Sequence, residues 1–109
     1  MHFIDLKETL KKQLGPGVTL NLAWGDKLML SVVELEPGST VPMHSHPHEQ
    51  AGIVLEGEFA LTIGGETKRV RKGDMYIIPG GVEHGAVTAQ EKAVALNIFH
   101  PIREDYTSS

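Results

Sequence analysis

Cysteine is absent from this chain of 109 residues. Disulfides, thiolate metal ligands and cysteine nucleophiles are therefore excluded together, and any metal must be bound through nitrogen or oxygen atoms. No apolar run approaches the roughly 20 residues that a membrane-spanning helix needs. Basic residues are not in excess either, because 10 Lys and Arg stand against 14 Asp and Glu, for a net charge of −4. Without a basic stripe, a nucleic-acid partner is not expected.

The start of the chain also lacks the basic region followed by an apolar region that marks a signal peptide, so we expect a cytoplasmic protein. The composition is typical of a globular domain, with 40% hydrophobic and 22% charged residues. The length fits one domain. We expect a single domain over residues 1–109, with an N-terminal arm over 1–17 and a polar, frayed tail over 104–109.

Turn-forming residues are abundant, with 12 glycines and six prolines. They separate short runs rich in Val, Ile, Leu, Thr and Phe, a rhythm typical of an all-β sandwich or barrel. Two pairs of neighbouring runs stand out, one interrupted at Glu56-Gly57 and one at Gly64-Gly65, where glycines suit a tight hairpin. The expected strands cover residues 19–24, 27–35, 51–56, 58–63, 66–71, 75–78 and 92–99.

The N-terminal segment is ambiguous. Asp5 and Glu8 are spaced as in a capping box, and leucines recur every four residues at positions 6, 10 and 14, as on one helix face. Gly15 would end such a helix. The alternative is an irregular arm or an edge strand, and no functional residue depends on the choice.

The histidines are the main candidates for chemistry. Three of the six fall within five residues, at positions 44, 46 and 48. Because alternate side chains of a strand face the same side, His44 and His46 would aim at one point, with Gln50 on the same face. His84 follows a Pro-Gly-Gly turn and would reach this point from another strand. A His-x-His pair by itself also fits surface or catalytic histidines.

The spacing around these histidines resembles the two motifs of the cupin superfamily, G-x5-H-x-H-x3-E-x6-G and G-x5-P-x-G-x2-H-x3-N. The first is matched by Gly38, His44, His46 and Gly57, and the second by Gly73, Pro79, Gly81 and His84, while Gln50 and Thr88 stand at the two remaining motif positions. The motifs span residues 38–88. The resemblance implies a double-stranded β-helix or jelly-roll barrel, often a homodimer. It also implies one divalent transition metal held by His44, His46, Gln50 and His84.

Gln50 stands where the family usually has glutamate, and Thr88 stands where it has asparagine. Thr88 is not at a ligand position, so it would affect packing only. Gln50 leaves the full charge of a dication uncompensated, which strengthens the Lewis acid but weakens its binding. A ligand set rich in imidazole suits Zn, Ni, Fe, Mn or Cu. With four protein ligands, a six-coordinate metal keeps positions open for substrate, as in a working site.

Other candidates flank the ligand set. Glu49 is an alternative ligand, although its parity points it away from His46. His48 shares that parity, but Pro47 distorts the strand, so we expect His48 at the pocket rim. His2 and His100 are expected on the surface.

The last expected strand places Ala95, Asn97 and Phe99 on one face. An amide inside a barrel needs a hydrogen-bond partner, so Asn97 would bind either a neighbour or a ligand. Arg103 follows closely and would suit a carboxylate at the pocket mouth. The alternative for Arg103 is a surface salt bridge with Glu104 or Asp105.

This C-terminal run, with its Phe-x-Pro-x-Arg-Glu-Asp pattern, is similar to the pectin-degradation cupins, which open unsaturated uronates to linear keto forms. The His-x-His-x-x-x-Gln string and Gly-Val-Glu-His-Gly around His84 are also shared. The resemblance implies a site with Phe99 as a gating aromatic and Arg103 as the arginine. The family's catalytic aspartate falls at Asn97, and an amide cannot accept a proton as a carboxylate does. Tyr76 and Glu83 are the alternative candidates for the role of proton acceptor.

Three functions remain open. The first is an enzyme that uses the metal as Lewis acid on a small acidic sugar, in uronate ring opening or tautomerisation. The second is a metal-dependent dioxygenase with Fe or Cu. The third is a non-catalytic module that binds a small molecule, which the missing carboxylate at Asn97 favours.

Overall fold

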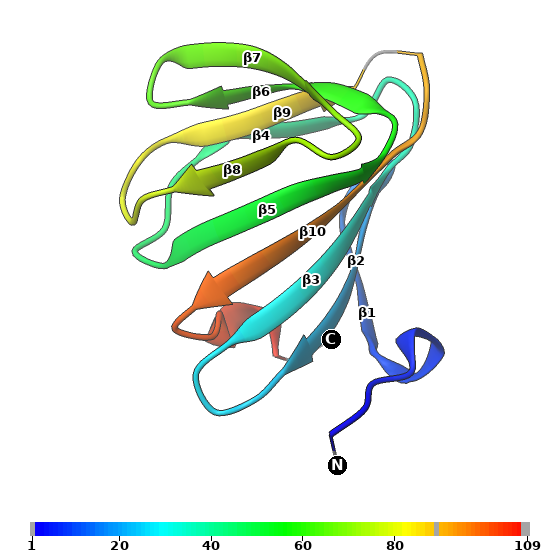
Figure 1. Ribbon diagram of the computed structural model, residues 1–109, viewed down its shortest axis with the longest axis vertical. Helices are drawn as coiled ribbons and strands as arrows, with labels where there is room; N and C mark the ends of the chain where they lie inside the picture. Colours follow the sequence, from blue (N-terminus) through cyan, green and yellow to red (C-terminus); the bar gives the residue numbers. More distant parts are fainter. Residues whose placement is uncertain (1, 89, 108–109) are drawn as a thin grey trace.

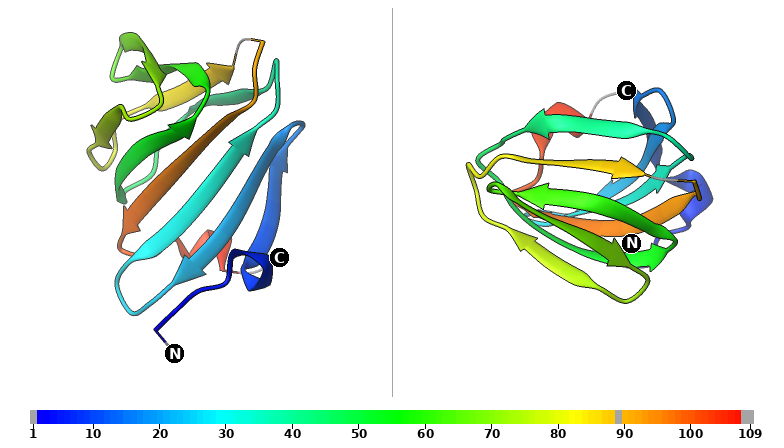
Figure 2. Two further views of the ribbon diagram at one scale, coloured as in Figure 1. Left: turned by 45° about the vertical axis from the view of Figure 1, so that its right-hand side comes forward. Right: turned by 90° about the horizontal axis from the view of Figure 1, so that it is seen from above.

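The computed structural model describes residues 2–88 and 90–107. Over these residues the chain forms two antiparallel sheets that face each other, as Figures 1 and 2 show. An apolar core fills the space between them. The strands are β1 (Leu10–Gly15), β2 (Val18–Trp24), β3 (Met29–Leu35), β4 (Thr40–His44), β5 (Glu49–Glu56), β6 (Glu58–Ile63), β7 (Glu66–Arg71), β8 (Met75–Ile78), β9 (His84–Thr88) and β10 (Ala93–His100). Two short 3-10 turns, η1 (Leu6–Glu8) and η2 (Glu104–Tyr106), flank them.

The larger sheet has the order β1-β2-β3-β10-β5-β8, and the smaller has the order β4-β9-β6-β7. Strand β10 lies between β3 and β5, although these strands are far from it in the sequence (Figure 1). Its side chains alternate as predicted, with Ala95, Asn97 and Phe99 buried in the interior. The all-β jelly-roll prediction is confirmed. Neither helical turn of the described chain approaches the length of a membrane-spanning helix.

All seven predicted strands are present; β4 and β9 were not among them, and β1 was given only as the alternative of an edge strand. The hairpin at Gly64-Gly65 is confirmed, and both glycines have positive φ, 56° and 87°. No hairpin forms at Glu56-Gly57, because β5 pairs with β10 and β8 whereas β6 pairs with β7 and β9. The chain instead changes sheets at Gly57. This residue has a φ of 72°, and a Cβ there would lie 2.2 Å from the carbonyl oxygen of Lys92.

The prediction of an N-terminal helix is wrong. Only Leu6–Glu8 forms a single 3-10 turn, in which the Asp5 carboxylate accepts a hydrogen bond from the backbone N–H of Lys7 at 2.9 Å. Leu10–Gly15 is an edge strand paired with β2, which was the alternative. The leucine spacing misled because the backbone groups of this segment find their partners on β2 rather than within a helix.

The prediction of a frayed C-terminal tail is also wrong over residues 104–107. Residues 108–109 lie outside the described part of the chain. Tyr106 is only 7% exposed and belongs to the core cluster. Its ring contacts that of Phe99, with centroids 6.2 Å apart. The turn η2 is therefore packed against the end of β10, and it builds one wall of the site described next.

Candidate metal centre

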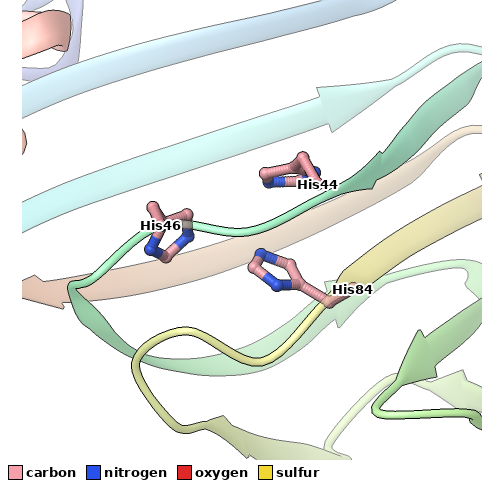
Figure 3. A group of neighbouring side chains, drawn as sticks. All are labelled: His44, His46 and His84. Carbon is pink, nitrogen blue, oxygen red and sulfur yellow. The ribbon is translucent and has the colours of Figure 1, made fainter.

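Strands β4 and β9 bring two of the predicted histidines together. His44 and His84 are direct partners across this strand pair, and their ring centroids lie 4.2 Å apart. The ring of His46 lies 4.9 Å from that of His84 and 5.7 Å from that of His44. Figure 3 shows the three imidazoles gathered at one place, where ligand nitrogens from all three lie within 4.8 Å of one another.

The reason given for the His-x-His pair holds only in part. His44 is the last residue of β4, but His46 lies in the loop that follows, so strand alternation does not orient its ring. What orients all three rings is a shared local contact. The Nδ1 atoms of His44, His46 and His84 lie 2.8, 3.1 and 2.9 Å from backbone carbonyl oxygens two residues away.

These contacts fix the tautomer. A carbonyl oxygen only accepts, so each Nδ1 carries the proton and donates it, which leaves the Nε2 lone pairs free. Metal-binding histidines almost always have such an outer hydrogen bond on the other ring nitrogen. The Nε2 atom of His84 is buried and has no hydrogen-bond partner among the described residues. An unpartnered, lone-pair-bearing nitrogen is the state of a ligand ready for a cation.

Gln50 completes the fit. Its side chain is 7% exposed, and its Oε1 lies 3.1 Å from Nε2 of His46. Because the His46 proton is on Nδ1, Nε2 and Oε1 both present lone pairs to the same region. A cation between them satisfies both atoms. The residues present therefore fit a divalent metal.

Burial keeps the rings of His46 and His84 neutral. Loss of water lowers the pKa of His46 from 6.5 to about 4, and the charge of Arg103 acts in the same direction. Burial also lowers the pKa of His84. Neutral imidazoles are the form that binds a metal, so protons compete little with it at neutral pH.

The remaining histidines and acidic candidates lie elsewhere. His2 and His100 are exposed, as predicted, and so are Glu49 and Glu83. His48 is half-buried beside His46, with ring centroids 5.4 Å apart, but it is not part of the converging group. Neither Glu49 as a ligand nor Glu83 as a base is supported by these positions.

The three-histidine group lies at a cavity inside the barrel, which has a volume of about 80 Å³. His44, His84 and Gln50 line it. Asn97 and Arg103, both predicted site residues, line the same cavity. Among the described residues, no aspartate or glutamate does so.

Asn97 has a partner within the protein. The hydroxyl of Tyr76 donates a hydrogen bond to Oδ1 of Asn97, at 2.7 Å. Burial raises the pKa of Tyr76, so the phenol stays protonated and acts as a donor. Tyr76 is therefore not suited to the role of base that the sequence left open for it.

Arg103 is 8% exposed, and it ion-pairs with Asp105, with Nη2 2.9 Å from the carboxylate. Its guanidinium carbon lies 3.9 Å from the ring centroid of Tyr106 and 5.3 Å from that of Phe99. The alternatives for Arg103 thus coexist, since the predicted ion pair forms while the guanidinium stays buried at the cavity. Stacking on two rings and an ion pair fix its orientation.

A cupin-domain family model matches residues 31–99 of this chain. The chain belongs to the cupin family. This cupin is 34% identical over 107 residues to the pectin degradation protein KdgF of Dickeya dadantii. The alignment covers 96% of both chains. It is 29% identical to H2HPP isomerase of Bacillus subtilis over 94% of its own length but only 43% of the isomerase.

Two solved structures are also similar to this cupin over nearly its whole length. An RmlC-like cupin from Shewanella frigidimarina superposes with a TM-score of 0.90 at 30% identity, covering 98% of this chain and 96% of the other. KdgF from Halomonas sp. superposes with a TM-score of 0.88 at 29% identity, covering 96% and 97%. The family and the three converging imidazoles together indicate a divalent metal ion at this site.

Two cavity residues carried no signal in the sequence: Ser31 lies among apolar residues of β3, and Tyr106 fell in the segment expected to fray. Gly52, over which the ring of Tyr76 lies, resembles any glycine of a β protein in the sequence. Thr88, expected to affect packing only, has a defined contact. Its hydroxyl accepts from the backbone N–H of Ser39 at 2.9 Å and lies 2.9 Å from the carbonyl oxygen of Glu36, so it ties down the 36–39 turn.

Proposed function

We propose that this cupin opens the ring of an unsaturated uronate to its linear keto form with the help of a divalent metal. The observation that carries the proposal is the cavity itself, where a set of converging candidate metal ligands lies with a buried, oriented arginine. The 34% identity to KdgF of Dickeya dadantii, a pectin degradation protein, supports a uronate as substrate.

His44, His46, Gln50 and His84 would hold the metal. As a bound Lewis acid, a divalent ion polarises the oxygen of a substrate hydroxyl or carbonyl and makes its proton more acidic. All four donors are neutral, which suits Zn, Ni, Fe, Mn or Cu rather than Mg or Ca.

The other side chains bind and orient the sugar. Arg103 would pair with the uronate carboxylate through the guanidinium edge that Asp105 leaves free. Asn97 would donate a hydrogen bond from Nδ2, since its Oδ1 already accepts from Tyr76. Phe99 would form the wall between the metal ligands and the arginine, because its ring contacts both His46 and Arg103.

The reaction is an isomerisation. The anomeric hydroxyl loses its proton as the bond from its carbon to the ring oxygen breaks, and the enolate that is released takes up one proton on carbon to become a ketone. No carboxylate lines the described cavity to move these protons, so solvent must do so. We therefore expect turnover slower than that of a variant with aspartate at position 97.

The test is to load metal-free protein separately with each of these metals and add unsaturated galacturonate. Loss of the ultraviolet absorbance of the enol ether reports ring opening. We expect measurable turnover in the wild type, a rise of about tenfold or more in Asn97→Asp, and loss in His84→Ala. A wild type that stays at the buffer rate with every metal overturns the proposal.

A second candidate, non-catalytic binding of a small molecule, is favoured by the lack of a carboxylate in the described cavity. It predicts that unsaturated galacturonate binds without turnover in the wild type, whereas Asn97→Asp turns it over. The dioxygenase alternative predicts oxygen uptake by Fe-loaded protein, which the sugar isomerisation does not consume.

We also propose that a second copy of the chain covers the outer face of the larger sheet. On the edge strand β8, Met75 is 77% and Ile77 is 61% exposed, and Leu55 on neighbouring β5 is 43% exposed. Half-buried apolar residues of β10 and β3 extend this face: Val32, Val94, Leu96 and Ile98. An exposed apolar edge of a sheet is prone to pair with another chain.

A further inference from the structure

A row of inward-facing residues crosses the larger sheet just inside the metal-binding layer. In the β3–β10 ladder Ser31 lies opposite Asn97, in the β10–β5 ladder Asn97 lies opposite Gly52, and in the β5–β8 ladder Gly52 lies opposite Tyr76. Four strands thus bring together three hydrogen-bonding side chains and one glycine in a single line.

Ser31 stands out in this row. It is 1% exposed, it lines the cavity, and within the part of the chain that the structure describes its hydroxyl has no hydrogen-bond partner. A buried hydroxyl without a partner costs free energy, so proteins rarely keep one without a use. The hydroxyl faces the cavity beside the amide of Asn97, whose Nδ2 also makes no hydrogen bond with the described residues.

Gly52 explains how the amide is held. A Cβ at this position would lie 2.3 Å from Cζ of Tyr76, so the phenol ring occupies the place where another residue would have its side chain. The ring passes over β5, and its hydroxyl reaches Oδ1 of Asn97 at 2.7 Å. With Oδ1 engaged, Nδ2 is turned toward the cavity and offers its protons there.

We propose that Ser31 and Asn97 form a hydrogen-bonding subsite for an acceptor oxygen of the ligand, and that Tyr76, lying over Gly52, is the residue that positions the amide. The ligand's oxygen accepts from Nδ2 of Asn97 and from the hydroxyl of Ser31. A carbonyl or hydroxyl oxygen fits this pair.

The register also sets the span of the ligand. Gln50 precedes Gly52 by two residues on the same face of β5, so the subsite lies about 7 Å deeper than the metal-binding layer. A six-carbon sugar acid is long enough to place one oxygen at the metal and another at this subsite. The identity of the ligand rests on the proposed function, but binding at the subsite does not require turnover.

The test uses Zn-loaded protein and D-galacturonate, a saturated uronate that lacks the enol ether and so cannot be converted to the keto product, with calorimetry for affinity and Tm for stability. Ser31→Ala should weaken binding by about five- to tenfold. Its Tm should stay the same or rise, because the substitution removes an unpartnered buried hydroxyl. A serine that serves only packing would not move the two measurements in opposite directions.

Ser39→Ala is the matched control. Ser39 is also buried, but its hydroxyl donates to the carbonyl oxygen of Glu36 at 2.7 Å and does not line the cavity. This variant should lose Tm and keep the wild-type affinity for galacturonate. Equal affinity in Ser31→Ala and Ser39→Ala overturns the proposal.

Tyr76→Phe and Gly52→Ala test the positioning role. Both should shift the NMR signals of the Asn97 side-chain amide and weaken galacturonate binding several-fold, because both remove the contact that orients Nδ2. If the amide signals are unchanged in both variants, Tyr76 does not position Asn97.

Activity separates this proposal from the proposed function. Galacturonate binding that depends on Ser31, without turnover of unsaturated galacturonate, supports the subsite and overturns the ring-opening function. Turnover with a KM that is unchanged in Ser31→Ala supports the function and overturns the subsite. A wild type that binds no galacturonate overturns the subsite whatever the turnover.

Discussion

His46 and His84 are held as neutral bases inside a protein, and that state has a cost at acid pH. Burial lowers the pKa of His46 to about 4 from an ordinary value of 6.5, and that of His84 in the same direction. Between these values the unfolded chain binds protons that the folded chain does not. The free energy of unfolding must therefore fall as the pH falls through this window.

We expect metal-free protein to keep full stability above about pH 6.5 and to lose it progressively toward pH 4. Urea unfolding at a series of pH values, after treatment with a chelator, measures the loss. In His46→Gln, which no longer titrates, the slope should be smaller. A wild type whose stability is flat over this window would show that burial does not suppress protonation of these rings.

The sequence was informative about residues that obey a strong local rule. The buried position of Asn97 follows from alternation along an apolar strand, and the spacing of the motifs singled out the three histidines that converge. Ser31 could not be found in this way, since a serine in an apolar strand has the same pattern whether or not it lines a cavity. Its importance depends on its register with β10, which is a long-range property.

At the scale of elements, the turn η2 determines how Arg103 is presented. Asp105 binds the guanidinium through Nη2 at 2.9 Å and Nε at 3.4 Å, while Tyr106 stacks against it. These contacts hold the arginine before any ligand arrives, so little side-chain entropy is lost on binding.

We expect Asp105→Asn to raise the KM for unsaturated galacturonate about three- to tenfold and to leave kcat nearly unchanged, since the substitution weakens the orientation of Arg103 and not the metal ligands. Steady-state kinetics measure kcat and KM separately. Glu104→Gln, an exposed neighbour on the same turn, should behave as the wild type. A lower kcat with an unchanged KM in Asp105→Asn would contradict a role in positioning.

The passage of the chain from one sheet to the other depends on Gly57. We expect Gly57→Ala to destabilise the fold by about 3 kcal/mol or more, because positive φ is strained for alanine and its Cβ would press on the Lys92 carbonyl. Gly65→Ala is the control, since it has positive φ but open space, and should cost about 1 kcal/mol. Chemical denaturation compares the two, and equal losses would show that the contact with Lys92 does not matter.

The strands that the sequence missed share a physical reason. β4 contains Pro42, β9 has a glycine as its second residue, and β1 has mixed polar composition. Each lies in a place where strand propensity is weak and pairing with a neighbour provides the order. For this reason His44 and His84 were predicted to meet, but their direct pairing across β4 and β9 was not.

For the molecule as a whole, the exposed apolar edge at β8 leads to a prediction about assembly. Ile77→Lys should convert a dimer to a monomer at micromolar concentration, because burial of a charge at an apolar contact is costly. Light scattering coupled to size exclusion measures the mass. Gln13→Lys, on the opposite edge strand of the same sheet, should leave the dimer intact. A wild type that is monomeric throughout contradicts the proposed second copy.

The central position of β10 orders events during synthesis. Residues 44, 46, 50 and 84, the candidate metal ligands, are all made before β10, yet the larger sheet has no middle until β10 inserts between β3 and β5. The histidines therefore emerge from the ribosome ahead of the strand that closes the barrel around them. Pairing across such long sequence separations is slow. A coordination that includes both the His44–His84 pair of the smaller sheet and Gln50 of the larger sheet would require the two sheets to have come together.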